Sequence, residues 1–424
     1  MLSGTSLCDL VDRRADATPD ALFVVDEHLE MLTFGDLAEE VDRAAAGLRS
    51  CGVAADSLVL WQLPNWIVSL VLPAALSRIG AGRLPVTPDV GATGLKANMM
   101  RSAPDLVVAP TLLGKDDYEL AVYDAASSVG GCDVLLVDRA LPQGDPGSLV
   151  DLTERPTDPD APPRPSWRFP TGSSSADLDD ERLMTAARTL AERLALTHRD
   201  RIAVLDPVAH LGGIVWLAAA LTSGASLVLV ETVGDDTLET LDREGVTVAP
   251  SGDRYDTMWL RGHHASLVPP LRNLRAFVGA DVPGPTPART RLGAAYDVPL
   301  LCGYGLVEAP IVAMPSVSDS DEVLATTHGR AAGGVELEVL GPDDAPVAAG
   351  TEGRIVVRCL SSTGVVSVHT ADRGILDEAG NLIVTEVDAD GASTGEVAEH
   401  ADGFTDLAER GRTDLGTRTD PTRD

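Results

Sequence analysis

Short apolar segments alternate with amphipathic helical segments through most of residues 20–312, and this alternation constrains the fold more than any other feature. Residues 33–52 predict a helix, because apolar side chains recur every three or four positions and Gly52 suits its end. A strand-like segment follows at residues 57–63, then a second helix that ends before the Gly80-Ala81-Gly82 turn. Strands that alternate with helices across short connections are typical of a parallel sheet covered by helices.

A second alternating unit begins near residue 181, and the pattern changes near residue 328 to strands separated by tight turns. We therefore predict an α/β fold with two doubly wound α/β subdomains and a small antiparallel β subdomain. A proline-rich stretch at 151–165 separates the two units, and the end of the chain has few large apolar residues. The expected divisions are 1–165, 166–327, 328–386 and an acidic, mobile tail over 387–424.

Charge and cysteine content exclude several classes of protein. Lys and Arg number 33 against 65 Asp and Glu, which gives a net charge of −32 and argues against nucleic acid or an anionic membrane as a partner. The five cysteines are widely spaced and predict neither a disulfide framework nor a metal site. The sequence shows no signal peptide and no long uninterrupted apolar run, so we expect a cytoplasmic protein.

Several motifs occur in one order that resembles the adenylate-forming superfamily, which includes acyl-CoA synthetases, nonribosomal adenylation domains and luciferases. DPVAHLGGIVWLAAALTSGASLVLVE carries the Pro, His and paired Gly of a family block. GADVPGP, GYGLVEA and TADRGILDEAGNLIV follow it in the family order. The resemblance covers roughly residues 5–385, and it implies the fold of the large N-terminal domain of these enzymes.

The resemblance implies a site in which a carboxylate attacks the α-phosphate of Mg-ATP. Developing charge on the phosphate oxygens requires cations and hydrogen-bond donors. Glu308 matches the magnesium-binding Glu. His210 matches a residue that lines the acyl pocket, and the alternative is a buried structural histidine. The nucleoside contacts implied for this chain are Gly279, Ala280, Tyr304, Gly305 and Asp372.

The phosphate loop departs from the family pattern of Tyr-Thr-Ser-Gly-Thr-Thr-Gly-x-Pro-Lys-Gly. FPTGSSSADL retains a small polar core, but Asp177 and Leu178 stand where the family has Pro and Lys. Val307 replaces a threonine of the Tyr-Gly-x-Thr-Glu motif, and no lysine follows Lys115. The candidate phosphate contacts that remain are Thr171, Gly172, Ser173 and Ser174.

Alternatives remain open at this site. The serine run is either an anion site built from backbone amides or a flexible loop. The acidic residues Asp179, Asp180 and Glu181 either hold Mg²⁺ or form the acidic first turn of a helix. FTDLAE, at residues 404–409, is an alternative counterpart of the ribose-binding segment.

We predict a divergent acyl- or aryl-CoA synthetase-like protein of a specialised biosynthetic pathway. It would handle a carboxylate, an acyl-adenylate or a thioester, with weak or absent adenylation on its own. The family's lysine-bearing C-terminal domain is expected to be missing. One alternative is an active ATP-dependent ligase with a rebuilt phosphate site or a partner-supplied lysine. Another is a pseudoenzyme scaffold that binds a partner enzyme or carrier protein. The expected cofactors are AMP, an acyl-adenylate or ATP with Mg²⁺.

Overall fold

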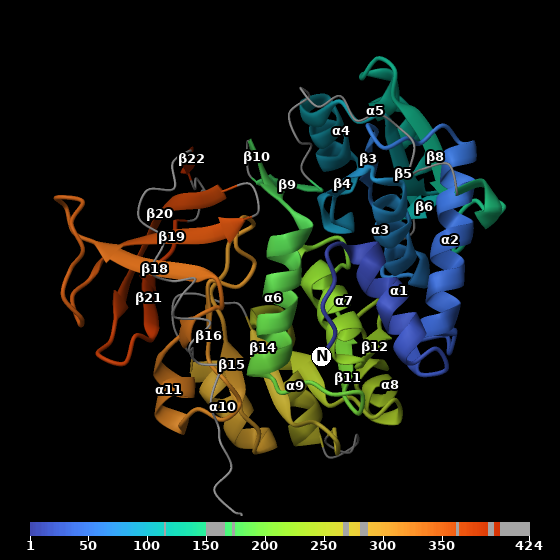
Figure 1. Cartoon of the computed structure of the whole chain (residues 1–424). Helices are drawn as coiled ribbons and strands as arrows, with labels where there is room; N and C mark the ends of the chain where they lie inside the picture. Colours follow the sequence, from blue (N-terminus) through green and yellow to red (C-terminus); the bar gives the residue numbers. More distant parts are fainter. Residues whose placement is uncertain are drawn as a thin grey trace, which may run out of the picture.

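Three large sheets, two short strand pairs and their covering helices form the described part of the molecule (Figure 1). The structure is a computed structural model that describes residues 1–113, 116–149, 166–171, 174–265, 271–279, 287–361, 364–388 and 394–398. The mixed α/β architecture with a small antiparallel sheet confirms the predicted fold class.

Sheet A has seven strands in the order β15-β14-β13-β11-β12-β1-β2. All its pairings are parallel except that of β1 with β2. Four strands, β11 to β14, are short apolar segments buried by helices, as expected for a parallel sheet. Their bounds are β1 Leu22–Asp26, β2 Met31–Thr33, β11 Arg201–Val204, β12 Ser226–Leu229, β13 Val248–Pro250, β14 Ala276–Gly279 and β15 Leu300–Cys302.

Sheet B has six strands in the order β10-β9-β4-β3-β5-β8, and only β9 and β10 pair in the antiparallel sense. Its strands are β3 Leu58–Trp61, β4 Gly82–Pro85, β5 Leu106–Pro110, β8 Asp133–Val137, β9 Trp167–Thr171 and β10 Ser174–Leu178. The chain exchanges strands between the two sheets, because β1 and β2 join sheet A whereas β9 and β10 complete sheet B. A division at residue 165 therefore does not follow the sheets.

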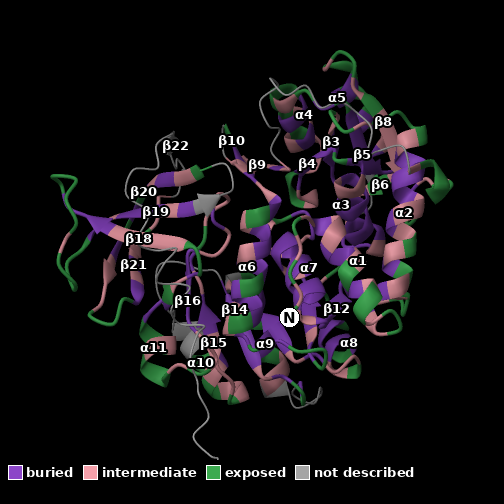
Figure 2. Cartoon of the chain, in the orientation of Figure 1, coloured by how far each residue is buried: buried purple, intermediate pink, exposed green. Residues whose placement is uncertain are grey.

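The main hydrophobic core lies among the helices between the two sheets, and Figure 2 shows most of α7 in the colour of buried residues. Contacts join α6 to α7, α2 to α3 and α1 to α7. The described helices are α1 Leu7–Ala17, α2 Phe34–Ser50, α3 Ile67–Ile79, α4 Gly91–Ser102, α5 Glu119–Ser127, α6 Asp180–Arg193, α7 Leu211–Ser223, α8 Thr237–Arg243, α9 Asp253–Ala265, α10 Pro287–Tyr296 and α11 Asp321–Thr326, with a 3-10 turn at Pro88–Val90. None of the helices in the described part of the chain is long and apolar enough to cross a bilayer.

Local sequence signals account for the helix ends. Thr33 and Asp36 form a capping box at the start of α2, with each side chain bonded to the other's backbone N–H. Gly224 ends α7 at φ 83°, a left-handed conformation that favours glycine.

The small β subdomain lies beside α6 and is built on an antiparallel sheet (Figure 1). Its strands are β18 Val335–Leu340, β19 Gly353–Ser361, β20 Gly364–Leu376, β21 Leu382–Glu386 and β22 Thr394–Ala398. Two short pairs complete the described strands: β6 Leu112–Leu113 with β7 Asp116–Asp117, and β16 Ala313–Met314 with β17 Arg330–Ala331. Because β22 pairs with β20, the sheet extends into the segment expected to be a mobile tail; residues 399–424 lie outside the described residues.

A buried ion pair fixes the position where sheet B passes into α6. The Arg83 side chain on β4 is 3% exposed, and its Nη2 lies 3.0 Å from Asp180 Oδ1 at the first residue of α6. The same carboxylate oxygen accepts a 2.8 Å hydrogen bond from Trp167 Nε1 on β9, and the Arg83 guanidinium lies 4.2 Å from the Trp167 ring centroid. Burial lowers the pKa of Arg83, and the Asp180 carboxylate opposes that effect. Two strands and a helix thus meet at one charged contact.

Asp180→Asn tests this contact. The substitution leaves the buried guanidinium without a counter-charge, so we expect the free energy of unfolding to fall by about 3–5 kcal/mol in urea denaturation. The control is Asp124→Asn, which removes the ion pair with Lys96; the Asp124 side chain is 71% exposed, and we expect a loss below about 1 kcal/mol. Equal losses in the two variants would contradict the structural role of Asp180.

Candidate functional site

A cavity of about 430 Å³ opens at the carboxyl ends of the sheet A strands. Its walls come from the start of α7, the residues that follow β13, β14 and β15, and the segment 303–314. Ligands of open α/β sheets bind at this edge. The described lining is mostly apolar and includes Leu190, Val215, Trp216, Ile311 and Met314. Such a cavity suits an acyl or aryl group.

His210 lies at the N-terminus of α7 and lines two cavities. It is the N-cap residue of α7, and its Nδ1 accepts a 3.2 Å hydrogen bond from Gly212 N. It borders both the 430 Å³ cavity and a neighbouring cavity of about 210 Å³, which Phe169 and Pro170 also line. The side chain is exposed rather than buried in the core. His210 is therefore accessible from both cavities.

Asn65 holds the loop that carries His210. Its Nδ2 donates to the carbonyl oxygens of Asp206 and Val230 at 2.9 and 3.0 Å, and its Oδ1 accepts from Val208 N at 2.8 Å. One buried amide thus satisfies three backbone groups at the ends of β11 and β12. Sequence reasoning assigned no role to Asn65, because its partners are 141 to 165 residues away.

The predicted nucleoside residues Tyr304 and Asp372 meet. The Tyr304 phenol donates a 2.6 Å hydrogen bond to Asp372 Oδ2, and Asp388 N donates to Asp372 Oδ1 at 2.8 Å. Burial and the neighbouring carboxylate raise the pKa of Tyr304, which keeps the phenol a donor. Asp372 is only 7% exposed. Both of its carboxylate oxygens therefore already have partners within the chain.

Two other predicted nucleoside contacts are glycines, and one of them, Gly305, packs against the backbone of Pro310. Gly305 approaches the backbone so closely that a Cβ atom would lie 2.1 Å from Pro310 O. Gly279 ends β14 and lines the cavity, whereas Ala280 lies outside the described residues.

The predicted phosphate loop is a tight hairpin of β9 and β10. Thr171 pairs with Ser174, their hydroxyls lie 3.0 Å apart, and Gly172 and Ser173 between them lie outside the described residues. Asp177 faces Arg168 across the ladder, with Arg168 Nε 3.0 Å from Asp177 Oδ1. The Asp177 carboxylate thus pairs with a cation of its own hairpin.

Leu178 faces the opposite side of the hairpin from Asp177, because side chains alternate along a strand. It pairs with Trp167, is 0% exposed and belongs to the main core. The residue that stands at the family's lysine position therefore points into the protein interior.

Arg182 joins this hairpin to Glu308. Its Nη1 donates to Glu308 O at 2.8 Å, Nη2 donates to Asp177 O at 3.2 Å, and Nε lies 2.9 Å from Asp179 Oδ2. The Arg182 side chain is 11% exposed. Nothing in the sequence indicated this contact, since Arg182 and Glu308 are 126 residues apart.

The acidic stretch after the hairpin forms the first turn of α6 rather than a free metal site. Asp179 is the N-cap residue and accepts a 2.7 Å hydrogen bond from Arg182 N. Asp180 is held by Arg83 and Trp167. The structure thus favours the helix interpretation over Mg²⁺ binding by these residues.

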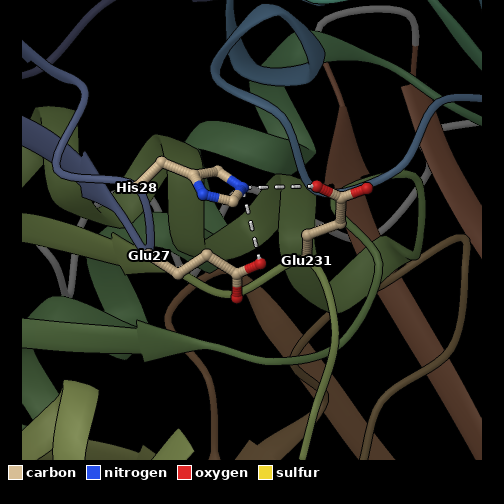
Figure 3. Close-up of side chains that lie close together, drawn as sticks. All are labelled: Glu27, His28 and Glu231. Carbon is tan, nitrogen blue, oxygen red and sulfur yellow. Dashed lines mark ion pairs between the residues drawn. The ribbon is translucent and has the colours of Figure 1, made fainter. Parts of the chain in front are cut away.

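A separate cluster brings Glu27, His28 and Glu231 together (Figure 3). His28 Nε2 lies 3.7 Å from Glu27 Oε1 and 4.0 Å from Glu231 Oε2. Arg139 bonds Glu231 Oε2 and lies 3.1 Å from His28 Nε2, so a guanidinium already supplies positive charge here. Arg139 also lies 5.2 Å from the Trp66 ring centroid. The cluster is best explained as an ion-pair network.

The residues described here fit the parts of a nucleotide unequally. Tyr304 and Asp372 lie together, and each Asp372 carboxylate oxygen accepts one hydrogen bond within the chain, which leaves acceptor capacity for a ribose hydroxyl. Glu308, which the resemblance assigns to Mg²⁺, is half-buried, and its backbone carbonyl is joined to the hairpin through Arg182. On the described part of the hairpin, Asp177 is paired with Arg168, and Leu178 is packed in the core, so it offers no cation.

Comparison with known proteins relates this chain to AMP-binding enzymes. The family model described as AMP-binding enzyme matches residues 11–167 and 178–363, and the match is interrupted over most of the hairpin. The salicyl-AMP ligase / salicyl-S-ArCP synthetase of Mycobacterium tuberculosis is 27% identical over 84% of this chain and 66% of its own length. The 4-coumarate–CoA ligase 5 of Oryza sativa subsp. japonica is 25% identical over 78% of this chain and 63% of its own length. The chain thus spans about two thirds of the length of these relatives.

Solved structures show the same fold. A long-chain-fatty-acid-CoA ligase from Archaeoglobus fulgidus superposes with a TM-score of 0.75 at 18% identity, over 91% of this chain and 85% of that one. The N-terminal domain of FACL13 from Mycobacterium tuberculosis gives a TM-score of 0.73 at 18% identity, over 90% of this chain and all of that domain. The family model covers more than half of the sequence. This chain belongs to the AMP-binding enzyme family, within the adenylate-forming superfamily.

Proposed function

We propose that this protein binds an acyl or aryl carboxylate, or its adenylate or thioester, and that its own ATP-dependent adenylation is weak or absent. The carboxylate or its activated form occupies the 430 Å³ cavity at the edge of sheet A. A carrier protein or a partner enzyme supplies or receives the acyl group, in keeping with a role in biosynthesis.

The state of the hairpin is the observation that carries this proposal. Asp177 is paired with Arg168, and Leu178 is packed in the core. Because Arg168 pairs with Asp177, the repulsion between this carboxylate and a phosphate is largely offset. Loss of one lysine hydrogen bond costs roughly 1.5–3 kcal/mol. That loss weakens triphosphate binding by about one to two powers of ten.

Arg182 supports a second candidate, an active ligase with a rebuilt phosphate site. It is a cation in contact with both the hairpin and the Glu308 backbone. Against this, its three nitrogen atoms already have oxygen partners, and Asp179 balances its charge. A phosphate would have to compete with these contacts, so we favour the first candidate.

Isothermal titration with Mg-ATP, AMP and a non-hydrolysable acyl-adenylate mimic distinguishes the possibilities. We expect micromolar binding of the mimic and no measurable binding of Mg-ATP. Tight Mg-ATP binding with pyrophosphate release in the presence of a carboxylate would establish the active ligase instead. Absence of binding by all three compounds, together with common acyl and aryl acids, would leave only a scaffold that binds proteins.

Leu178→Lys tests whether the loss of the family lysine is reversible by one substitution. Since Leu178 is fully buried, the new ammonium group would enter the core, and we expect the free energy of unfolding to fall by about 3 kcal/mol or more with no gain in Mg-ATP affinity. Leu178→Met, a volume-conserving control, should cost less than about 1.5 kcal/mol. A Lys variant as stable as the Met variant, and with measurable Mg-ATP binding, would show that this position can face the phosphates.

A further inference from the structure

We infer that the cluster of Glu27, His28 and Glu231 is also a binding site for one divalent cation of the zinc class, which takes the place of Arg139. Without the cation, these residues and Arg139 form an ion-pair network. The three ligand residues lie outside the lining of the 430 Å³ cavity. The inference therefore goes beyond the proposed function and does not rest on it.

Two neighbouring strands of sheet A bring the three ligand residues together. β1 and β12 are parallel, and Asp26 at the end of β1 lies opposite Leu229 at the end of β12. The ligand residues follow these strand ends, so they meet at one edge of the sheet. The turn after β1 is held in place, because Asp26 Oδ1 accepts hydrogen bonds of 2.9 Å from His28 N and from Glu30 N.

The ligand atoms lie only slightly farther apart than a bound tetrahedral metal requires (Figure 3). His28 Nε2 lies 3.7 Å from Glu27 Oε1 and 4.0 Å from Glu231 Oε2, and the three atoms lie within 4.8 Å of one another. Zinc bonds to nitrogen and to carboxylate oxygen are about 2.0–2.2 Å long, which places tetrahedral ligands about 3.3–3.6 Å apart. His28 is exposed and both glutamates are partly exposed, so small side-chain rotations close the difference.

The imidazole of His28 presents a lone pair to the cluster. Arg139 Nη2 lies 3.1 Å from His28 Nε2, and a guanidinium can only donate, so Nε2 is the acceptor in this contact. Arg139 also donates to Glu231 Oε2. A neutral imidazole nitrogen and two carboxylates are ligands that zinc accepts, whereas imidazole disfavours Mg²⁺.

A buried carboxylate behind the cluster offers Arg139 a second position. Asp26 is 2% exposed, its Oδ2 accepts no hydrogen bond, and Arg139 Nη1 lies 3.8 Å from that oxygen. Buried polar atoms are normally hydrogen-bonded, so this oxygen has an unused capacity to accept. A shift of about 1 Å would bring the guanidinium within hydrogen-bond distance of Asp26 and release Glu231 and His28 for a metal.

The charge of the network also favours a dication. Asp26, Glu27 and Glu231 supply three carboxylates, and Arg139 is the cation that the described residues place in contact with them. Negative charge therefore exceeds positive charge by two. One divalent cation neutralises this excess, and by bridging its ligands it joins the turn after β1 to the end of β12.

Isothermal titration of the EDTA-treated and desalted protein with ZnCl₂ tests the site. We expect binding of about one Zn²⁺ per chain, unchanged by an excess of MgCl₂. Zinc should also raise the midpoint of thermal unfolding, because a ligand that binds only the folded chain stabilises it.

Variants assign the binding to the cluster. His28→Ala should weaken zinc binding at least about tenfold and remove the thermal shift. The matched control is His198→Ala, which removes an exposed histidine outside the cluster and should change neither result. Arg139→Met removes the competing cation but keeps an apolar side chain beside Trp66, and it should tighten zinc binding about tenfold. A thermal scan without zinc confirms that each variant is folded.

No measurable zinc binding, or equal affinity in His28→Ala and the unmodified protein, would overturn the inference. Several weakly bound equivalents would mark adventitious binding by surface carboxylates and would overturn it too. Weaker binding in Arg139→Met would contradict the exchange of Arg139 for the metal. The proposed function is tested separately with nucleotides and the acyl-adenylate mimic, so each of these results leaves it standing.

Discussion

The buried contact of Arg83 with Asp180 is the constraint on which the geometry of the site depends. It joins β4, β9 and the first residue of α6. The strand that leads into α6, β10, is therefore held in one register, with one set of its side chains directed at the core. With that facing fixed, Leu178 packs in the core and Asp177 lies on the outer side, beside Arg168. The phosphate hairpin is thus shaped by the core beneath it, and its departures from the family pattern are built into the fold.

The two halves of the site follow different physical rules. The cavity at the edge of sheet A arises from strand ends and the start of α7, and mostly apolar residues line it. On the nucleotide side, Tyr304 and Asp388 N each donate a hydrogen bond to Asp372, and Arg182 joins the hairpin to Glu308. These internal contacts support the proposal that the protein's own adenylation is weak.

Sequence reasoning predicted the elements whose causes are local. The helix at 33–52 follows from its apolar spacing and its cap at Thr33, and the structure places it at Phe34–Ser50. The family resemblance assigned Tyr304 and Asp372 separately to the nucleoside, and their direct hydrogen bond is a finding of the structure. The strand exchange between the sheets and the Arg182 contact could not be predicted, because each depends on pairing between segments far apart in the chain. The burial of Leu178 was not predicted, because residues 174–178 were interpreted as a loop, whereas they form a strand whose side chains alternate between the core and the surface.

A crystal structure of the protein with a bound acyl-adenylate mimic tests the central claim most directly. The account predicts that the acyl group occupies the cavity beside Trp216, with Arg168 still paired to Asp177 and Leu178 still in the core. A structure in which the hairpin opens, Asp177 leaves Arg168 and the hairpin amides close around the phosphate would contradict it.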